Sequence, residues 1–395
     1  MTTEVGDGNR IAFLDVLRGV ALFGILLVNV FSFGADYPAW SGVADQLIWQ
    51  VKHVVFETKF WMLYSLVFGM GFFLQTQSPG YTMARSLRRL SVLMLFGCLH
   101  GLLFEGDILM LYAELGVLLL LLHRLPTKWL LSLGLLLMLS FPLGHLLGGD
   151  RGDEWPADNA AEASAWLEED LMDSPLAVGS FTEVLAYHAA LLPERFWADW
   201  QYPDSGFLVL ACFLVGFCFM RGGWPMLTRL TGLQSALIAA GLWVLGLSLM
   251  GIEAYWAAAV GYAPFERSDA SPMQVLGGDL VYLVATLSLT CAWLFSVWCW
   301  AQSRKLIRVR SLIASAGQMS LTGYVSQTLI FTTVFYGYGL GAGFIWGPTH
   351  VVAFAAGVYS LQVVFCHGWL QRFRRGPLEW LWRCLTYWRW EPIRR

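Results

Sequence analysis

Residues 11–33 read IAFLDVLRGVALFGILLVNVFSF, and this stretch decides the fold class. As a helix it is long enough to cross the hydrocarbon layer of a bilayer, which takes about 20 largely apolar residues. It is longer than the apolar core of a secretory signal peptide, and it carries Asp15 and Arg18. We therefore expect a retained first transmembrane helix.

The rest of the chain repeats this apolar pattern. Of its 395 residues, 57% are hydrophobic and 13% are charged, whereas soluble domains carry about 25% charged residues. The seven cysteines follow neither metal-binding nor disulfide spacing. Backbone polar groups must be satisfied within the segment in lipid, so each apolar segment is expected to be helical. The sequence predicts an all-α polytopic membrane bundle of about ten transmembrane helices, at residues 11–33, 59–77, 89–105, 108–123, 127–148, 205–221, 230–250, 275–301, 312–337 and 345–369.

Lys and Arg are divided unequally between the loops of these helices. With the N-terminus placed inside, the outer face receives Lys52, Lys59, Arg151, Arg195 and Arg267, and the inner face receives the other basic residues. Basic residues favour cytoplasmic loops. We therefore expect a multi-pass protein of the bacterial inner (plasma) membrane with both termini in the cytoplasm.

Four regions follow from this topology. Residues 1–148 form an N-terminal membrane bundle with the candidate site, and residues 205–370 form a C-terminal membrane bundle. Between them, residues 149–204 are an extracytoplasmic loop rich in acidic residues and Trp, either solvated with interfacial helices or a lid over the site. Residues 371–395 are a basic, Trp-rich cytoplasmic tail suited to a membrane surface.

The first helix carries three polar residues on one side. At 100° per residue, Arg18 and Asn29 differ by about 20° around the helix and Asp15 lies within about 40° of Asn29. Arg18 and Asn29 are separated by roughly 16 Å of helical rise. Ionisable residues inside membrane helices are costly and commonly functional. The alternative is a structural ion pair with an interhelical hydrogen bond from Asn29.

The segment GCLHGLLFEGDILMLYAELG, residues 97–116, is the most informative for chemistry. A tight turn around Gly106 predicts an antiparallel helical hairpin. His100 lies in an apolar setting, and Asp107 can fold back to orient its imidazole, as in a general base held by a carboxylate. Glu114 lies nearby. The competing interpretation is an interhelical hydrogen bond from a lone histidine.

Other polar groups extend the candidate site. The inner loop residues Arg85, Arg88 and Arg89 suit the phosphates of a nucleotide-containing donor, or they set topology alone. Glu57 and Lys59 lie at the outer boundary of the second helix. In the ninth segment, hydrogen-bonding side chains suggest a polar cavity or polar helix contacts, and they are Gln318, Ser320, Tyr324 and Gln327.

Four blocks, at residues 10–30, 56–72, 97–116 and 317–331, resemble the YeiB-like family of bacterial multispanning proteins over nearly the whole chain. That family is similar to a wider group of transmembrane acyltransferases, including heparan-glucosaminide acetyltransferase-like and polysaccharide O-acyltransferase-like proteins. The shared feature is an opening helix with D-x-x-R-G and a polar residue eleven positions after the Arg. O-acyltransferases have His there, whereas this chain has Asn29, as in the heparan type. Since Asn cannot act as a base, His100 is expected to take the proton.

The resemblance implies an acyltransferase with acyl-CoA as its co-substrate, entering from the arginine side, and a hydroxyl or amine acceptor near the outer face. His100 would be the general base, Asp107 its orienting partner and Asn29 a donor to the acyl carbonyl. Expected partners are membrane lipid and a small-molecule, glycan or lipid-linked acceptor, without nucleic acid. No tightly bound cofactor or metal is expected, and the sequence does not fix the oligomeric state. The alternatives are a transporter or exporter, for which the sequence lacks paired interrupted helices, and a non-catalytic scaffold or sensor.

Overall fold

A computed structural model describes residues 12–33, 42–146, 174–201, 203–260, 271–343 and 345–395. Within these ranges the chain is helical and no β-strand forms. The first half contains α1 (Ala12–Asn29), η1 (Val30–Phe33), α2 (Val43–Val51), η2 (Lys52–Phe56), α3 (Lys59–Thr76), α4 (Met83–Gly101), α5 (Leu109–Leu122), α6 (Thr127–Leu146), α8 (Pro175–Val178) and α9 (Phe181–Gln201). The second half contains α10 (Pro203–Cys218), η3 (Phe219–Gly223), α11 (Trp224–Arg229), α12 (Gly232–Val260), α13 (Pro272–Gln302), α14 (Ile307–Gln318), α15 (Ser320–Phe335), α16 (Pro348–Arg372) and α17 (Pro377–Tyr387).

Six helical segments of the described chain are long and apolar enough to cross a membrane, and they are Ala12–Phe33, Thr127–Gly144, Gly206–Arg229, Gly232–Trp256, Pro272–Gln302 and Pro348–Arg372. The all-α polytopic membrane class is thereby confirmed. Ten helices were expected, and the other four are shorter or more polar. α4 carries three arginines, α3 begins at Lys59, and α5 and α15 have only 14 and 16 residues.

The ninth expected helix, 312–337, is not continuous, so that expectation was wrong. α14 ends at Gln318 and α15 begins at Ser320, with Met319 between them at φ −113° and ψ 31°. The break exposes backbone N–H groups at the start of α15, which a helix leaves without intrahelical partners. Two of these groups are bonded by a carboxylate from α17, as described below.

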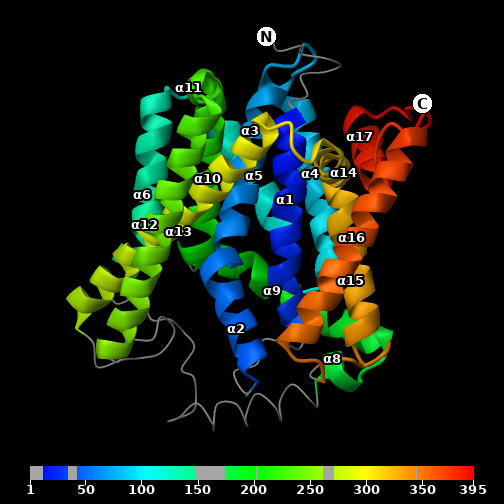
Figure 1. The fold of residues 1–395 in the computed structure, drawn as a ribbon. Helices are drawn as coiled ribbons and strands as arrows, with labels where there is room; N and C mark the ends of the chain where they lie inside the picture. Colours follow the sequence, from blue (N-terminus) through cyan, green and yellow to red (C-terminus); the bar gives the residue numbers. More distant parts are fainter. Residues whose placement is uncertain (1–11, 34–41, 147–173, 202, 261–270, 344) are drawn as a thin grey trace.

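The first helix lies near the middle of the bundle, with α3 to one side and α14, α15 and α16 to the other (Figure 1). Its contact with α14 depends on two glycines. Gly19 of α1 faces Ile313, and Gly317 of α14 faces the backbone of Asp15 and Gly19. Small residues allow membrane helices to approach closely, so this crossing holds the start of α1 against α14.

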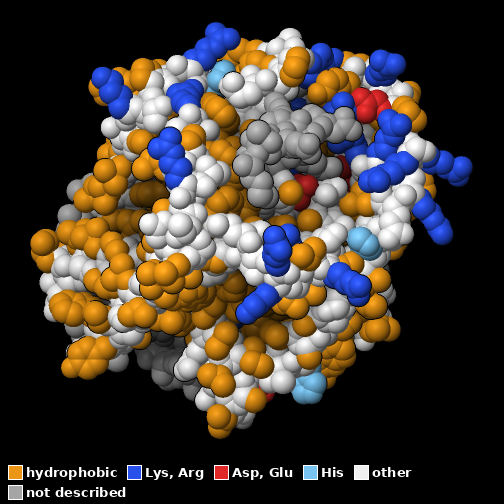
Figure 2. Space-filling view, turned by 45° about the horizontal axis from the view of Figure 1, so that its top comes forward, with side chains coloured by type: hydrophobic (Ala, Val, Ile, Leu, Met, Phe, Trp, Pro, Cys, Tyr) orange, Lys and Arg blue, Asp and Glu red, His pale blue; other side chains and the backbone are white. Residues whose placement is uncertain are grey.

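One end of the bundle is rich in basic side chains. α1 begins at the end that carries α11 and α17, whereas α8 lies at the opposite end (Figure 1). Figure 2 shows Lys and Arg side chains gathered on the first end and hydrophobic side chains over the flank. This distribution matches the unequal loop charges in the sequence.

Candidate functional site

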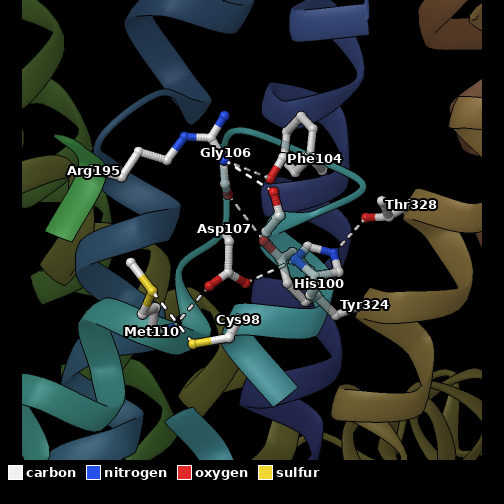
Figure 3. A network of polar contacts seen from close by, with 10 residues as sticks. Cys98, His100, Phe104, Gly106, Asp107, Met110, Arg195, Tyr324 and Thr328 are labelled. Atoms are coloured by element: carbon white, nitrogen blue, oxygen red, sulfur yellow. Dashed lines mark hydrogen bonds and ion pairs between the residues drawn. The ribbon is translucent and has the colours of Figure 1, made fainter. Parts of the chain in front are cut away.

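The expected hairpin of α4 and α5 is present, and it brings His100 to Asp107. His100 lies in the last turn of α4, and Asp107 lies in the loop before α5. The His100 Nδ1 and Asp107 Oδ1 atoms are 2.7 Å apart (Figure 3). The imidazole is 2% exposed, so this contact is shielded from solvent.

Asp107 is fixed by a second bond. Its Oδ2 accepts a hydrogen bond of 2.8 Å from the backbone N–H of Met110, in the first turn of α5. Gly97 makes room for this arrangement, because a side chain there would come within 2.5 Å of the Met110 nitrogen. A carboxylate only accepts hydrogen bonds when ionised, so the His100 proton resides on Nδ1 and the lone pair on Nε2.

The Nε2 atom of His100 has a partner that the sequence did not indicate. It lies 2.8 Å from the Oγ1 of Thr328 on α15. The ring of Tyr324, one turn earlier on α15, lies 4.7 Å from the imidazole. His100 is therefore held by the loop before α5 and by α15, and both of its nitrogens are engaged (Figure 3).

A cavity of about 370 Å³ adjoins this pair on the side of Asp107. We call it the Asn29 cavity. Its polar walls come from Asn29, Glu57, Thr58 and Asp107, and its apolar walls include Trp61 and Phe60. Asn29 and the carboxylate that orients His100 thus face one space.

The backbone is strained at Thr58, which lines this cavity. Thr58 has φ 62° and ψ −44°, a region that a β-branched residue rarely adopts. The Lys59 N–H donates 2.6 Å to the Glu57 carbonyl across it, closing a γ-turn, and a π-helical turn, η2, precedes it. The Thr58 Oγ1 and Tyr282 hydroxyl lie 3.1 Å apart. Strain of this kind costs about 1–3 kcal/mol and clusters at functional sites.

A second cavity, of about 280 Å³, lies toward the end that carries α17. We call it the arginine cavity. Its described lining residues include a single carboxylate, Glu379, and five arginines, which are Arg18, Arg85, Arg89, Arg375 and Arg383. Guanidinium groups bind phosphate through two parallel hydrogen bonds. This cavity therefore suits a phosphate-bearing ligand.

One wall of the arginine cavity comes from α17. Glu379 accepts hydrogen bonds of 2.7 Å and 3.0 Å from the N–H groups of Leu321 and Thr322, and one of 2.5 Å from the Thr322 hydroxyl. The Arg89 guanidinium lies 4.2 Å from the Trp382 ring centre. The basic tail expected as a surface anchor thus includes a helix that packs on α4 and α15.

The two cavities meet inside the bundle. Ile25 and Ile108 line both of them. Tyr324 lines the arginine cavity, and its hydroxyl donates 3.1 Å to the carbonyl of Gly106, which lines the Asn29 cavity. A thin layer of side chains therefore separates an arginine-rich space from the space at Asp107 and Asn29.

The segment before α10 also reaches the site. Arg195 of α9 donates to the carbonyl of Phe104 at 3.4 Å (Figure 3). It also donates to the carbonyl of Gly101 at 3.2 Å and to His188 Nδ1 at 3.1 Å. It neutralises the carbonyl end of α4, where His100 lies. Burial and the adjacent Arg195 lower the pKa of His188 to about 4, so its imidazole is neutral and accepts. A cavity of about 110 Å³ separates Arg195 from Asp107.

Other residues singled out in the sequence lie apart from the two cavities. Asp15 is buried and lies 3.5 Å from Arg18. Lys59 is fully buried and donates 3.0 Å to the His53 carbonyl. Gln327 donates 2.7 Å to Gln362 of α16 in a helix contact. Arg88 and Glu114 line neither cavity.

Gln318, Ser320 and Tyr324 do line the arginine cavity. Thr328, Glu379 and Arg195 were missed by sequence reasoning. Their partners are far away in the chain, and no spacing pattern links them. Within the described ranges, no group of three or more His, Cys, Asp or Glu side chains could hold a metal ion.

Sequence comparison with known proteins places this chain in a family. The family model described as "Protein of unknown function (DUF418)" matches residues 230–389. The chain is 33% identical to YeiB of Escherichia coli (strain K12), covering 94% of this chain and 95% of that protein. It is 30% identical to YxaH of Bacillus subtilis (strain 168), covering 97% and 96%.

A third relative, the 39.9 kDa protein in the amylase 3' region of Bacillus acidopullulyticus, is 25% identical over 97% of this chain and 96% of its own length. No solved structure matches. The similarity to YeiB and YxaH spans the helices that build both cavities. The chain therefore belongs to the YeiB and YxaH family of DUF418 membrane proteins.

Proposed function

We propose that this protein is an integral-membrane acyltransferase. It moves an acyl group from a thioester donor, acyl-CoA, held in the arginine cavity to a hydroxyl or amine acceptor in the Asn29 cavity. The observation that carries the proposal is that Asp107, the carboxylate that holds His100, faces the same cavity as Asn29. That cavity shares Ile25 and Ile108 with the arginine cavity.

The donor side is assigned by charge. Five arginines against one carboxylate give the arginine cavity a strongly cationic wall. Trp382 and Tyr387 also line it and offer aromatic faces for a base. In the bacterial inner membrane the basic end would face the cytoplasm, where acyl-CoA is present. The acyl chain then points along α1 toward Ile25 and Ile108.

The acceptor side is assigned by hydrogen-bonding capacity. Asn29 offers an amide N–H to a carbonyl oxygen that gains charge in the tetrahedral state. Asp107 keeps the His100 imidazole in the tautomer that accepts a proton at Nε2, and it stabilises the imidazolium that results. Glu57 and Thr58 add polar groups for an acceptor at the same cavity.

The test is acyl transfer by protein reconstituted in lipid vesicles. Radiolabelled short-chain and long-chain acyl-CoAs are supplied with a bacterial envelope extract as acceptor source, and free CoA and labelled product are measured. We expect His100→Gln and Asp107→Asn to lower the rate by about 10²–10⁴-fold. The matched control, Ser360→Ala on the exposed face of α16, should keep the wild-type rate. Full activity in His100→Gln contradicts the assignment.

Transport is the second candidate, because two cavities separated by a thin layer also suit alternating access. Ile25 and Ile108 line both cavities in the described structure. The same vesicles distinguish the two functions. A transporter moves intact acyl-CoA into the lumen without releasing CoA, whereas the acyltransferase releases CoA and labels an acceptor.

A further inference from the structure

The hydroxyl of Thr328 is arranged differently from its neighbours on α15. Hydroxyls in helices commonly bond a carbonyl three or four residues earlier. Ser326 bonds the Gly323 carbonyl at 2.9 Å, and Thr332 and Thr333 bond the Leu329 carbonyl at 3.3 and 2.7 Å. Thr328 instead points across the bundle to His100 Nε2 at 2.8 Å. Its hydroxyl is thus committed to the imidazole.

The direction of that hydrogen bond follows from Asp107. The carboxylate takes the proton of Nδ1, so Nε2 carries a lone pair and accepts from the Thr328 hydroxyl. A hydroxyl donating to an imidazole, which in turn donates to a carboxylate, is the arrangement that activates a nucleophile. The two distances, 2.8 and 2.7 Å, lie within the range for such a chain.

Burial limits what His100 itself can reach. His100 and Thr328 are 2% and 4% exposed, and the Thr328 hydroxyl already bonds the one imidazole nitrogen that carries a lone pair. Any proton that His100 accepts in this arrangement comes first from Thr328. Tyr324, one turn of about 5.4 Å before Thr328 on α15, lines the arginine cavity. Thr328 lines neither cavity in the described structure, and the Tyr324 ring lies 4.7 Å from the His100 imidazole. A thioester must therefore move past Tyr324 to bring its carbonyl carbon to the Thr328 hydroxyl.

We propose that Thr328 is the nucleophile of this site, which carries the acyl group as an O-acyl-threonine between donor and acceptor. This inference rests on the proposed acyltransferase function. Thr328 Oγ1 forms a bond to the thioester carbonyl carbon while His100 Nε2 takes the hydroxyl proton. The carbon–sulfur bond then breaks, and His100 returns the proton to the departing thiolate. In the second half, the acceptor oxygen or nitrogen bonds to the acyl carbon while its proton passes to His100 Nε2. The ester bond between the acyl carbon and Thr328 Oγ1 then breaks, and His100 returns the proton to Oγ1.

The test compares Thr328→Val, Thr328→Ser and the control Thr332→Val in the reconstituted protein. Thr332 lies one turn later on the same helix, is equally buried and bonds only the Leu329 carbonyl in the described structure. Acyl-CoA turnover is measured, and the protein is incubated with radiolabelled acetyl-CoA without acceptor, acid-quenched and digested. Thermal unfolding checks that each variant folds.

We expect label on the peptide that contains Thr328 in the wild type and in Thr328→Ser, and none in Thr328→Val. Turnover should fall by at least about 100-fold in Thr328→Val, while Thr328→Ser and Thr332→Val stay within about threefold of the wild type. If Thr328→Val turns over acyl-CoA at the wild-type rate, or if turnover proceeds without label on Thr328, the nucleophile is refuted and the acyltransferase stands. If the wild type neither releases CoA nor takes label, both proposals fail.

Discussion

The close crossing of α1 and α14 predicts that a methyl group added at Gly317 destabilises the protein. In Gly317→Ala, the added methyl group would overlap the carbonyl oxygen of Asp15 and come within 2.7 Å of the Gly19 nitrogen. Both are backbone atoms, which cannot rotate aside as a flexible side chain can. Overpacking of this kind costs about 1–3 kcal/mol, and we expect about 3 kcal/mol here because the overlap is with backbone.

The matched control is Gly357→Ala on α16, where an added methyl group meets nothing within 4 Å. That substitution should stabilise the helix by about 0.5–1 kcal/mol. Thermal unfolding followed by intrinsic Trp fluorescence in detergent checks both variants. We expect Gly317→Ala to lower the apparent Tm by about 3–6 °C, at about 1–2 °C per kcal/mol for a chain of this size. A Tm equal to that of wild type would refute the close crossing.

Further predictions concern the two helices that reach the site from outside the core bundle. Glu379→Ala leaves two backbone N–H groups and the Thr322 hydroxyl without their acceptor. The packing of α17 on α15 should therefore be destabilised by about 3 kcal/mol. Limited proteolysis of the C-terminal segment should accelerate, and unchanged cleavage would contradict this role. For α9, the pKa of His188 is lowered from 6.5 to about 4 in the folded state. The stability that α9 gains from neutral His188 is therefore present above pH 6.5 and is lost as pH falls toward 4. Hydrogen exchange in α9 should increase over that window, and His188→Gln should abolish the pH dependence. An equal response in both proteins would rule out His188 as its source.

Local sequence patterns were sufficient for the membrane class and for the centre of the site. The apolar segments, the α4–α5 hairpin and the nearness of His100 to Asp107 depend on contacts between residues close in the chain. Seven positions separate His100 from Asp107, and one tight turn joins them. Their spacing therefore carried most of the information.

Contacts between distant segments could not be read in this way. Thr328 lies 228 residues from His100, and helical periodicity gives no sign of which side chain an imidazole will meet across a bundle. The break at Met319 also depends on a distant group, since Glu379 of α17 bonds the N–H groups that the break exposes. The apolar composition of residues 312–337, taken alone, predicts one continuous helix.

The strained turn at Thr58 could not be predicted from the sequence for a different reason. Nothing in the residue type of a threonine indicates a positive φ, and β-branched residues disfavour it. The conformation is held by the Tyr282 hydroxyl and the bond across the γ-turn. Its position beside Glu57 places polar groups at the Asn29 cavity, so tertiary contacts override the local preference at the candidate site.

The central claim is that a donor in the arginine cavity reaches the His100 site from inside the bundle. The most direct measurement is an electron cryomicroscopy structure in lipid nanodiscs with a non-hydrolysable thioether analogue of acyl-CoA. The account predicts phosphate density among Arg18, Arg85 and Arg89, with the acyl chain running past Tyr324 toward Thr328. Analogue density on another surface, with the arginine cavity left without it, would contradict the account.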